Sequence, residues 1–441
     1  MALDSSVKVR ANSHPGAPTL SGTAGSMIAV LDAVLVNGFN LLGADSVVVS
    51  GGVATVTRAA GGFWSHMGTQ GAYEGLVVLI AGATPTALNG EKRILRVALT
   101  SSTTFTFDAT GVADGAATGT ITFKYAPLGW SKLYTGTNTA IYQRMDLNAT
   151  GSVLVVYDTY GKYALMRMAE VSNPALLATG GGWSNSADSV WTKSNVADGS
   201  ARAWTIIGDG RGFFMARGWH ANDQQGMEHT YWGDIAPAKA NDPYCCVTFG
   251  ANQDCSGVAG GPGYFPSSLM DESTAGSVAT VFPGDYRGSW YIQRSYSGMG
   301  SPAPVKRNAV AIAPAGSTSS GYLVWGISGW GASLSGAGPS DAQLFATSIP
   351  FPNPADNGIF GVPVIVWEFQ SPAIRGTLPG LFYLPMTTLY TNFVNYASTS
   401  GTGVLSGRVI LQVTSKVNAN ASRATNSNGG VLYDITGPWA R

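Results

Sequence analysis

The chain has 441 residues, of which 45% are hydrophobic and 11% charged, and 25 basic residues balance 25 acidic ones. Ordinary hydrophobicity without net charge excludes a disordered chain, and the lack of a basic cluster argues against a nucleic-acid partner. So few charges predict that much of the surface is covered in an assembly; a neutral monomer rich in Ser, Thr, Asn and Gly is the alternative.

Residues 1–25 are polar with scattered Gly and Pro, and we expect an N-terminal arm. They lack the basic segment and apolar run of a signal peptide. The most apolar early stretch, Met27–Leu42, is too short and too polar to span a bilayer. We therefore expect a protein made in the cytoplasm that does not insert into a membrane.

Residues 26–42 hold the best helix candidate, with apolar residues from Met27 to Val36 and Gly38 as a C-terminal stop. A buried strand is the alternative, because short apolar runs fit both structures.

A series of strands follows this segment. Ser46–Ser50 and Val53–Thr57 are joined by two glycines, which predicts a hairpin. The pair Asn89–Gly90 is typical of a hairpin corner. Residues 26–130 therefore predict a small β-module, whose further strands are Leu76–Ile80, Arg93–Leu99, Thr103–Phe107 and Thr118–Lys124.

Residues 131–441 predict a larger β-sandwich or barrel-like domain, so the fold class is mainly β. Pro363 suggests that its strand starts late or lies at a sheet edge. The strand candidates are Ser152–Tyr157, Ala203–Ile207, Gly212–Met215, Trp290–Arg294, Tyr322–Gly326, Val362–Phe369 and Arg408–Val413.

Acid–base candidates gather between His220 and His229, with Asp223 and Glu228 inside this segment and Asp234 close behind. The spacing fits neither a zinc nor a calcium motif, so we interpret the segment as a polar loop between two strands. The carboxylates near aromatic residues, which a glycan hydrolase would need in a pair, are Asp209, Glu228, Asp234 and Glu368.

No nucleophile elbow or phosphate-binding loop is present, and we expect no catalytic, cofactor-binding or metal-binding residues. The thiols of Cys245, Cys246 and Cys255 are expected to be reduced, with a disulfide to another chain as the alternative. Several aromatic residues could lie at a subunit interface or bind a glycan, although core packing is favoured. They are Trp183, Trp191, Trp219, Tyr231, Trp232 and Trp290.

Several stretches resemble virion proteins of tailed bacteriophages. Gly82–Gly90 (GATPTALNG), Thr103–Phe107 (TTFTF) and Gly111–Ile121 (GVADGAATGTI) resemble a β-module that recurs in such proteins. Further stretches resemble phage structural proteins of this layout: Gly16–Gly22, Leu31–Phe39, Arg202–Trp204, Gly208–Phe214, Tyr231–Asp234 and Asp434–Trp439.

This resemblance implies a non-enzymatic structural component of the tail, baseplate or neck, located in the virion. It also implies a symmetric homo-oligomer, a trimer or a multiple of three, that contacts other phage proteins. One alternative is a tail fibre or receptor-binding protein that contacts a host cell-surface glycan. The second is a tailspike enzyme that degrades glycans.

Overall fold

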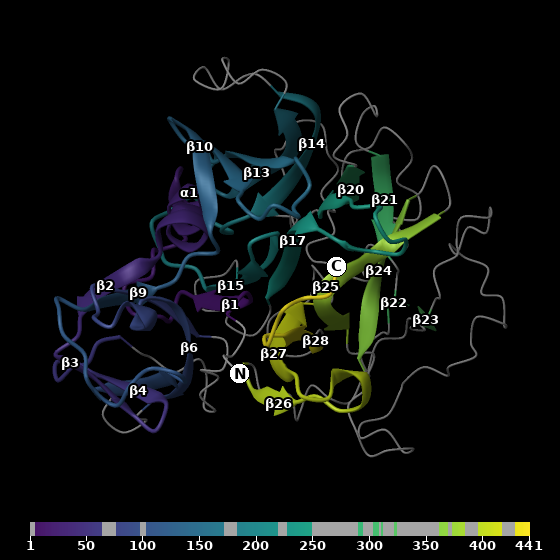
Figure 1. The fold of residues 1–441 in the computed structure, drawn as a ribbon. Coiled ribbons are helices and arrows are strands. Elements are labelled where there is room, and N and C mark those ends of the chain that lie inside the picture. The colour runs from purple at the N-terminus through teal and green to yellow at the C-terminus, as the bar shows by residue number, and fades with distance from the viewer. Residues whose placement is uncertain are drawn as a thin grey trace.

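The computed structural model describes residues 5–63, 76–97, 103–171, 183–218, 227–248, 290–293, 303–307, 310–311, 322–323, 361–368, 373–383, 396–416 and 428–441. Over these residues the protein is mainly β, as predicted, with several antiparallel sheets and one short α-helix near the N-terminus (Figure 1). No helix of this described part is long and apolar enough to cross a membrane.

The helix predicted in residues 26–42 is confirmed. Helix α1 (Ser26–Leu31) continues as a π-helix, η1 (Asp32–Asn37), and both bury their apolar side chains. The helix ends at Gly38, whose φ of 69° lies in the left-handed region that glycine adopts without strain.

The small module is an eight-stranded sheet with the order β2-β9-β5-β6-β7-β4-β3-β8. The predicted hairpin of β3 and β4 is confirmed, and Gly51 and Gly52 form its turn with φ of 58° and 76°. The strands are β2 (Phe39–Gly43), β3 (Ser46–Ser50), β4 (Val53–Thr57), β5 (Val77–Ala81), β6 (Gly90–Val97), β7 (Thr104–Asp108), β8 (Gly115–Ala116) and β9 (Thr122–Tyr125).

The expected tight corner at Asn89–Gly90 is wrong. Strands β5 and β6 are paired, but the loop between them contains a 3-10 turn, η2 (Thr86–Leu88). The Asn89 side chain accepts a hydrogen bond from Ala83 N and donates one to Ala83 O, both at 2.8 Å. Asn89 therefore closes a longer loop, in which its side chain replaces backbone pairing.

A five-stranded antiparallel meander follows the module. Its strands are β10 (Trp130–Gly136), β11 (Thr139–Arg144), β12 (Val153–Tyr157), β13 (Tyr163–Val171) and β14 (Trp183–Thr192). One face packs into a hydrophobic core that also contains module residues such as Phe105 and large-sheet residues such as Trp232. The core is therefore continuous across residue 130.

The largest sheet has thirteen strands within the described residues. Strand β24 lies between β21 and β25, but β21 pairs only with residues 366–368. Within the described residues Pro363 is therefore paired on the β25 side alone, and a register shift follows it. The strands are β1 (Lys8–Ala11), β15 (Trp204–Asp209), β16 (Gly212–Arg217), β17 (Glu228–Asp234), β18 (Ala236–Pro237), β19 (Cys245–Val247), β20 (Trp290–Gln293), β21 (Ala303–Arg307), β24 (Val362–Glu368), β25 (Ala373–Tyr383), β26 (Ser398–Ser400), β27 (Val409–Lys416) and β28 (Asn428–Asp434). Two short strands, β22 (Val310–Ala311) and β23 (Tyr322–Leu323), pair separately, and a 3-10 turn, η7 (Gly403–Leu405), precedes β27.

The N-terminal segment is not a free arm. Residues 8–11 form β1, which pairs antiparallel with β15 and is buried along its length (Figure 1). The Arg10 guanidinium donates hydrogen bonds to the carbonyl oxygens of Val77 (2.7 Å) and Ala126 (2.6 Å) in the module. The polar sequence suggested exposure, but these bonds satisfy the buried charge and fasten the strand between module and sheet.

Candidate functional site

The aromatic candidates whose side chains the structure describes are core residues. Trp191, Tyr231 and Trp232 have no exposed surface. The Trp191 indole donates a hydrogen bond to Thr248 O at 2.8 Å, and the Trp232 ring lies 5.4 Å from that of Trp130. These three rings therefore follow the core-packing alternative and present no surface to a partner.

The other three aromatic candidates cannot be placed in this way. Trp183 belongs to β14 and Trp290 to β20, but their side chains lie outside the description, as does all of Trp219.

The segment from His220 to His229 is only partly described, since residues 219–226 lie outside the described ranges. Glu228 and His229 are not in a loop as expected: both belong to β17 and are fully buried. Glu228 Oε2 lies 4.0 Å from Nη2 of Arg217, and His229 Nδ1 lies 2.6 Å from the Tyr433 hydroxyl. Both side chains thus face groups of the protein interior.

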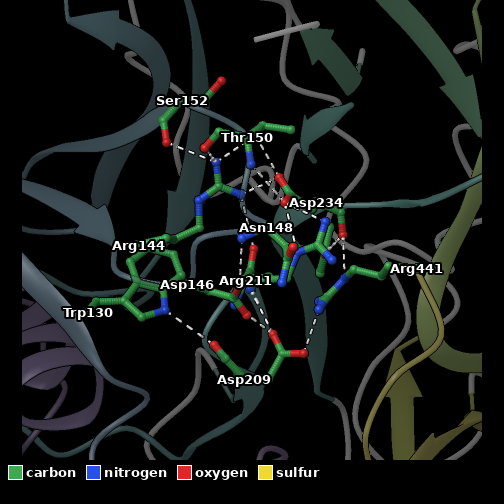
Figure 2. Close-up of polar contacts among 12 residues, drawn as sticks. Trp130, Arg144, Asp146, Asn148, Thr150, Ser152, Asp209, Arg211, Asp234 and Arg441 are labelled. Atoms are coloured by element: carbon green, nitrogen blue, oxygen red, sulfur yellow. Dashed lines mark hydrogen bonds and ion pairs between the residues drawn. The ribbon is translucent and has the colours of Figure 1, made fainter. Parts of the chain in front are cut away.

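The most elaborate polar arrangement is centred on Asp234, at the end of β17 (Figure 2). Its carboxylate is fully buried and binds two arginines: Arg144, the last residue of β11, and Arg211, whose Nη2 lies 3.1 Å away. Thr150 donates to the same carboxylate from its backbone N at 3.0 Å and from its hydroxyl at 2.6 Å. Asp234 therefore joins the five-stranded sheet to the largest sheet.

A second carboxylate extends this network (Figure 2). Asp209 accepts hydrogen bonds from the backbone N of Arg211 at 2.8 Å and of Gly212 at 3.0 Å, which fixes the turn between β15 and β16. Its other oxygen lies 2.5 Å from Nη1 of Arg441, and Arg441 Nε donates to Asp234 O at 3.0 Å. The C-terminal side chain is thereby held in the same buried cluster.

The electrostatics of the cluster keep Asp234 charged. Burial raises the pKa of a carboxyl group, but the charge of Arg144 and the hydrogen bonds from Thr150 outweigh it, so the pKa of Asp234 lies below its usual value. A carboxylate held ionised by two arginines is a poor general acid or base near neutral pH. The geometry suits a structural ion pair.

A second buried pair joins Lys193 and Asp158, both fully buried. Burial raises the pKa of Asp158 and lowers that of Lys193. The other Asp158 oxygen accepts hydrogen bonds from the backbone N of Met27 at 2.7 Å and of Ile28 at 3.2 Å. This pair thus fastens the first turn of α1 to the five-stranded sheet.

Two of the three cysteines are described, and both are free and buried in β19. Burial raises the pKa of Cys245 to about 12 and that of Cys246 well above its usual value. Such thiols are unreactive near neutral pH. Within the described residues, no group of three His, Cys, Asp or Glu side chains could hold a metal ion.

Sequence reasoning found Asp209 and Asp234 but missed their three arginine partners. Arg211 stands in the stretch Gly208–Phe214, so its proximity to Asp209 could have been foreseen. Arg144 and Arg441 are far from Asp234 in the sequence, and no local pattern marks them.

Comparison with known proteins adds no assignment. No protein-family model matches the chain, and a search of curated proteins finds no match.

Proposed function

We propose that the protein is a non-enzymatic structural component of a tailed-phage particle. It assembles there as a symmetric homo-oligomer in the tail, baseplate or neck. The virion setting rests on the resemblance of its sequence to phage structural proteins. The expected symmetry, a trimer or a multiple of three, rests on the same resemblance.

The non-enzymatic part of this proposal is supported by the contacts that the ionisable side chains make. Asp209, Glu228, His229 and Asp234 are the candidates for chemistry whose side chains the structure describes, and all four are buried against partners of the protein interior. A catalytic group must reach a substrate, whereas these groups connect strands to one another. Their placement supports a rigid building block.

The alternative of a glycan-binding fibre would gain support from exposed aromatic rings at the candidate positions. Trp191, Tyr231 and Trp232 are buried, so they do not supply it. The tailspike alternative needs two carboxyl groups roughly 5–10 Å apart in an open groove. The buried carboxylates Asp209 and Asp234 are each paired with arginine, which does not favour that chemistry.

The proposal is tested by immunogold labelling of purified phage particles with an antibody raised against residues 131–441. Gold at the neck, baseplate or along the tail supports the structural role. Gold confined to fibre tips would move the protein to the receptor-binding alternative. Absence of the chain from purified particles by mass spectrometry would refute the virion assignment, and release of reducing sugar from host polysaccharide would refute the non-enzymatic one.

A further inference from the structure

The loop between β11 and β12 exposes two large apolar side chains next to the buried ion cluster. Within residues 145–149, Met145 is 59% exposed and Leu147 is 100% exposed. Single apolar residues on a surface are common, but two within three residues of one anchored loop are less so.

The protein holds this loop rigidly at both ends. Arg144 and Thr150 flank it, and both bind the buried carboxylate of Asp234 (Figure 2). Inside the loop, Asp146 accepts hydrogen bonds from Asn148 N at 2.8 Å, through its side chain, and from Ala149 N at 3.0 Å, through its backbone O. A loop fixed before it meets a partner loses little conformational entropy on binding.

The charges beside the loop are of both signs. Asp146 is exposed, and its Cβ lies 3.6 Å from where a Cβ of Gly210 would stand, next to Arg211. The Arg211 side chain is 18% exposed although it also binds Asp234. The patch formed by loop 145–149 and Arg211 thus carries apolar, acidic and basic groups, which makes it complementary to itself.

We propose that loop 145–149 anchors a contact with a second copy of this chain. In that contact Met145 and Leu147 pack against the same patch of the other copy, and Asp146 of each copy faces Arg211 of the other. Because the same patch meets itself, a twofold axis relates the two copies, so of the expected symmetries the contact fits a multiple of three that contains twofold axes and not a simple trimer. The inference rests on the proposed function, which requires self-assembly. A stable interface covers about 800 Å² per partner, so the loop is the centre of a wider contact. The zero net charge of the chain leaves two copies without overall repulsion.

The test uses sedimentation velocity of the full chain over a range of concentrations. Leu147→Ser should raise the dissociation constant by about tenfold to hundredfold, because a buried leucine is lost from the interface. Val404→Ser is the matched control, since Val404 is also 100% exposed but stands on η7, which contributes no residue to the loop or to the ion cluster. Asp146→Asn keeps the acceptor for Asn148 N but removes the negative charge. It should therefore raise the dissociation constant more at low salt than at high salt.

Equal dissociation constants for the wild type, Leu147→Ser and Val404→Ser would overturn the inference while leaving assembly intact. A monomeric wild type that is nevertheless built into particles would also overturn it, and the proposed function would stand. A monomeric wild type that is absent from particles would refute both. Unchanged thermal midpoints of the variants establish that folding is not the cause.

Discussion

Replacing Asp234 with alanine should destabilise the protein strongly, because it removes the centre of the buried ion cluster. The Arg144 side chain is 1% exposed and would keep its charge without a counterion. Thr150 would lose the acceptor of its backbone N and of its hydroxyl. Breaking one partner out of a buried ion pair costs about 3–5 kcal/mol. That loss is a large part of the roughly 5–15 kcal/mol by which a typical domain is stable.

The assay is urea denaturation followed by tryptophan fluorescence, with Asp198→Ala as the control. Asp198 also pairs with an arginine, Arg202, at 3.2 Å, but its side chain is 41% exposed. The Asp198 carboxylate is open to solvent, so its removal should cost only about 0–1 kcal/mol. The buried Arg202 keeps its hydrogen bonds to Ser200 O and Ala201 O in this variant. If Asp234→Ala shifts the urea midpoint no further than Asp198→Ala, the cluster around Asp234 does not stabilise the fold and the reasoning is wrong.

The pH dependence of the same carboxylate gives a second measurement. The pKa of Asp234 is lowered in the folded protein, so its stabilisation is complete above the unfolded value of about 3.9. It is lost as the pH falls through the lower, folded pKa. The wild type should therefore lose more stability than Asp234→Asn between about pH 4 and pH 2. Parallel pH profiles of the two proteins would contradict the lowered pKa.

Three further predictions follow from other contacts. Deleting residues 1–11 removes β1 and its buried side chains, which contribute about 1.5–3 kcal/mol for each buried valine. The thermal midpoint should therefore fall, and an unchanged midpoint would support a free N-terminal arm instead. Gly22→Ala should cost about 1–3 kcal/mol in urea denaturation because its Cβ would lie 1.9 Å from a backbone oxygen, whereas Gly199→Ala, with open space, should be neutral. Iodoacetamide at pH 8 should label Cys245 and Cys246 only after unfolding. Peptide mapping measures the labelling, and rapid labelling of the native protein would contradict this prediction.

The sequence predicted the elements whose signals are local. The pattern of Ser46–Thr57 placed a hairpin correctly, because two β-prone runs and a Gly-Gly turn all favour the same structure. The helix after residue 25 and its end at Gly38 were predictable for the same reason. Where several local preferences agree, tertiary contacts have little to override.

The elements that failed depend on partners far away in the sequence. Lys8–Ala11 contains two cations in four residues and reads as exposed, yet β15 and carbonyl groups of the module bury it. Glu228 and His229 read as a polar loop, yet they belong to β17, which is buried along its length. Inside the protein, Arg217 faces Glu228 and Tyr433 faces His229. Polar residues become interior residues when their partners arrive from other strands, and a local pattern does not contain that information.

These buried charges bear on how the surface behaves. The chain is 11% charged, and many of those groups are in the interior: Lys8, Arg10, Arg93, Arg144, Asp158, Lys193, Arg202, Asp209, Arg217, Glu228, Asp234 and Asp434. The charge left for the surface is therefore lower than composition indicates. An interface made of such a surface desolvates few ions, and the cost that charged groups add to association is correspondingly small. The same residues thus stabilise the fold from inside, and their absence from the surface would lower the cost of the proposed contact between copies.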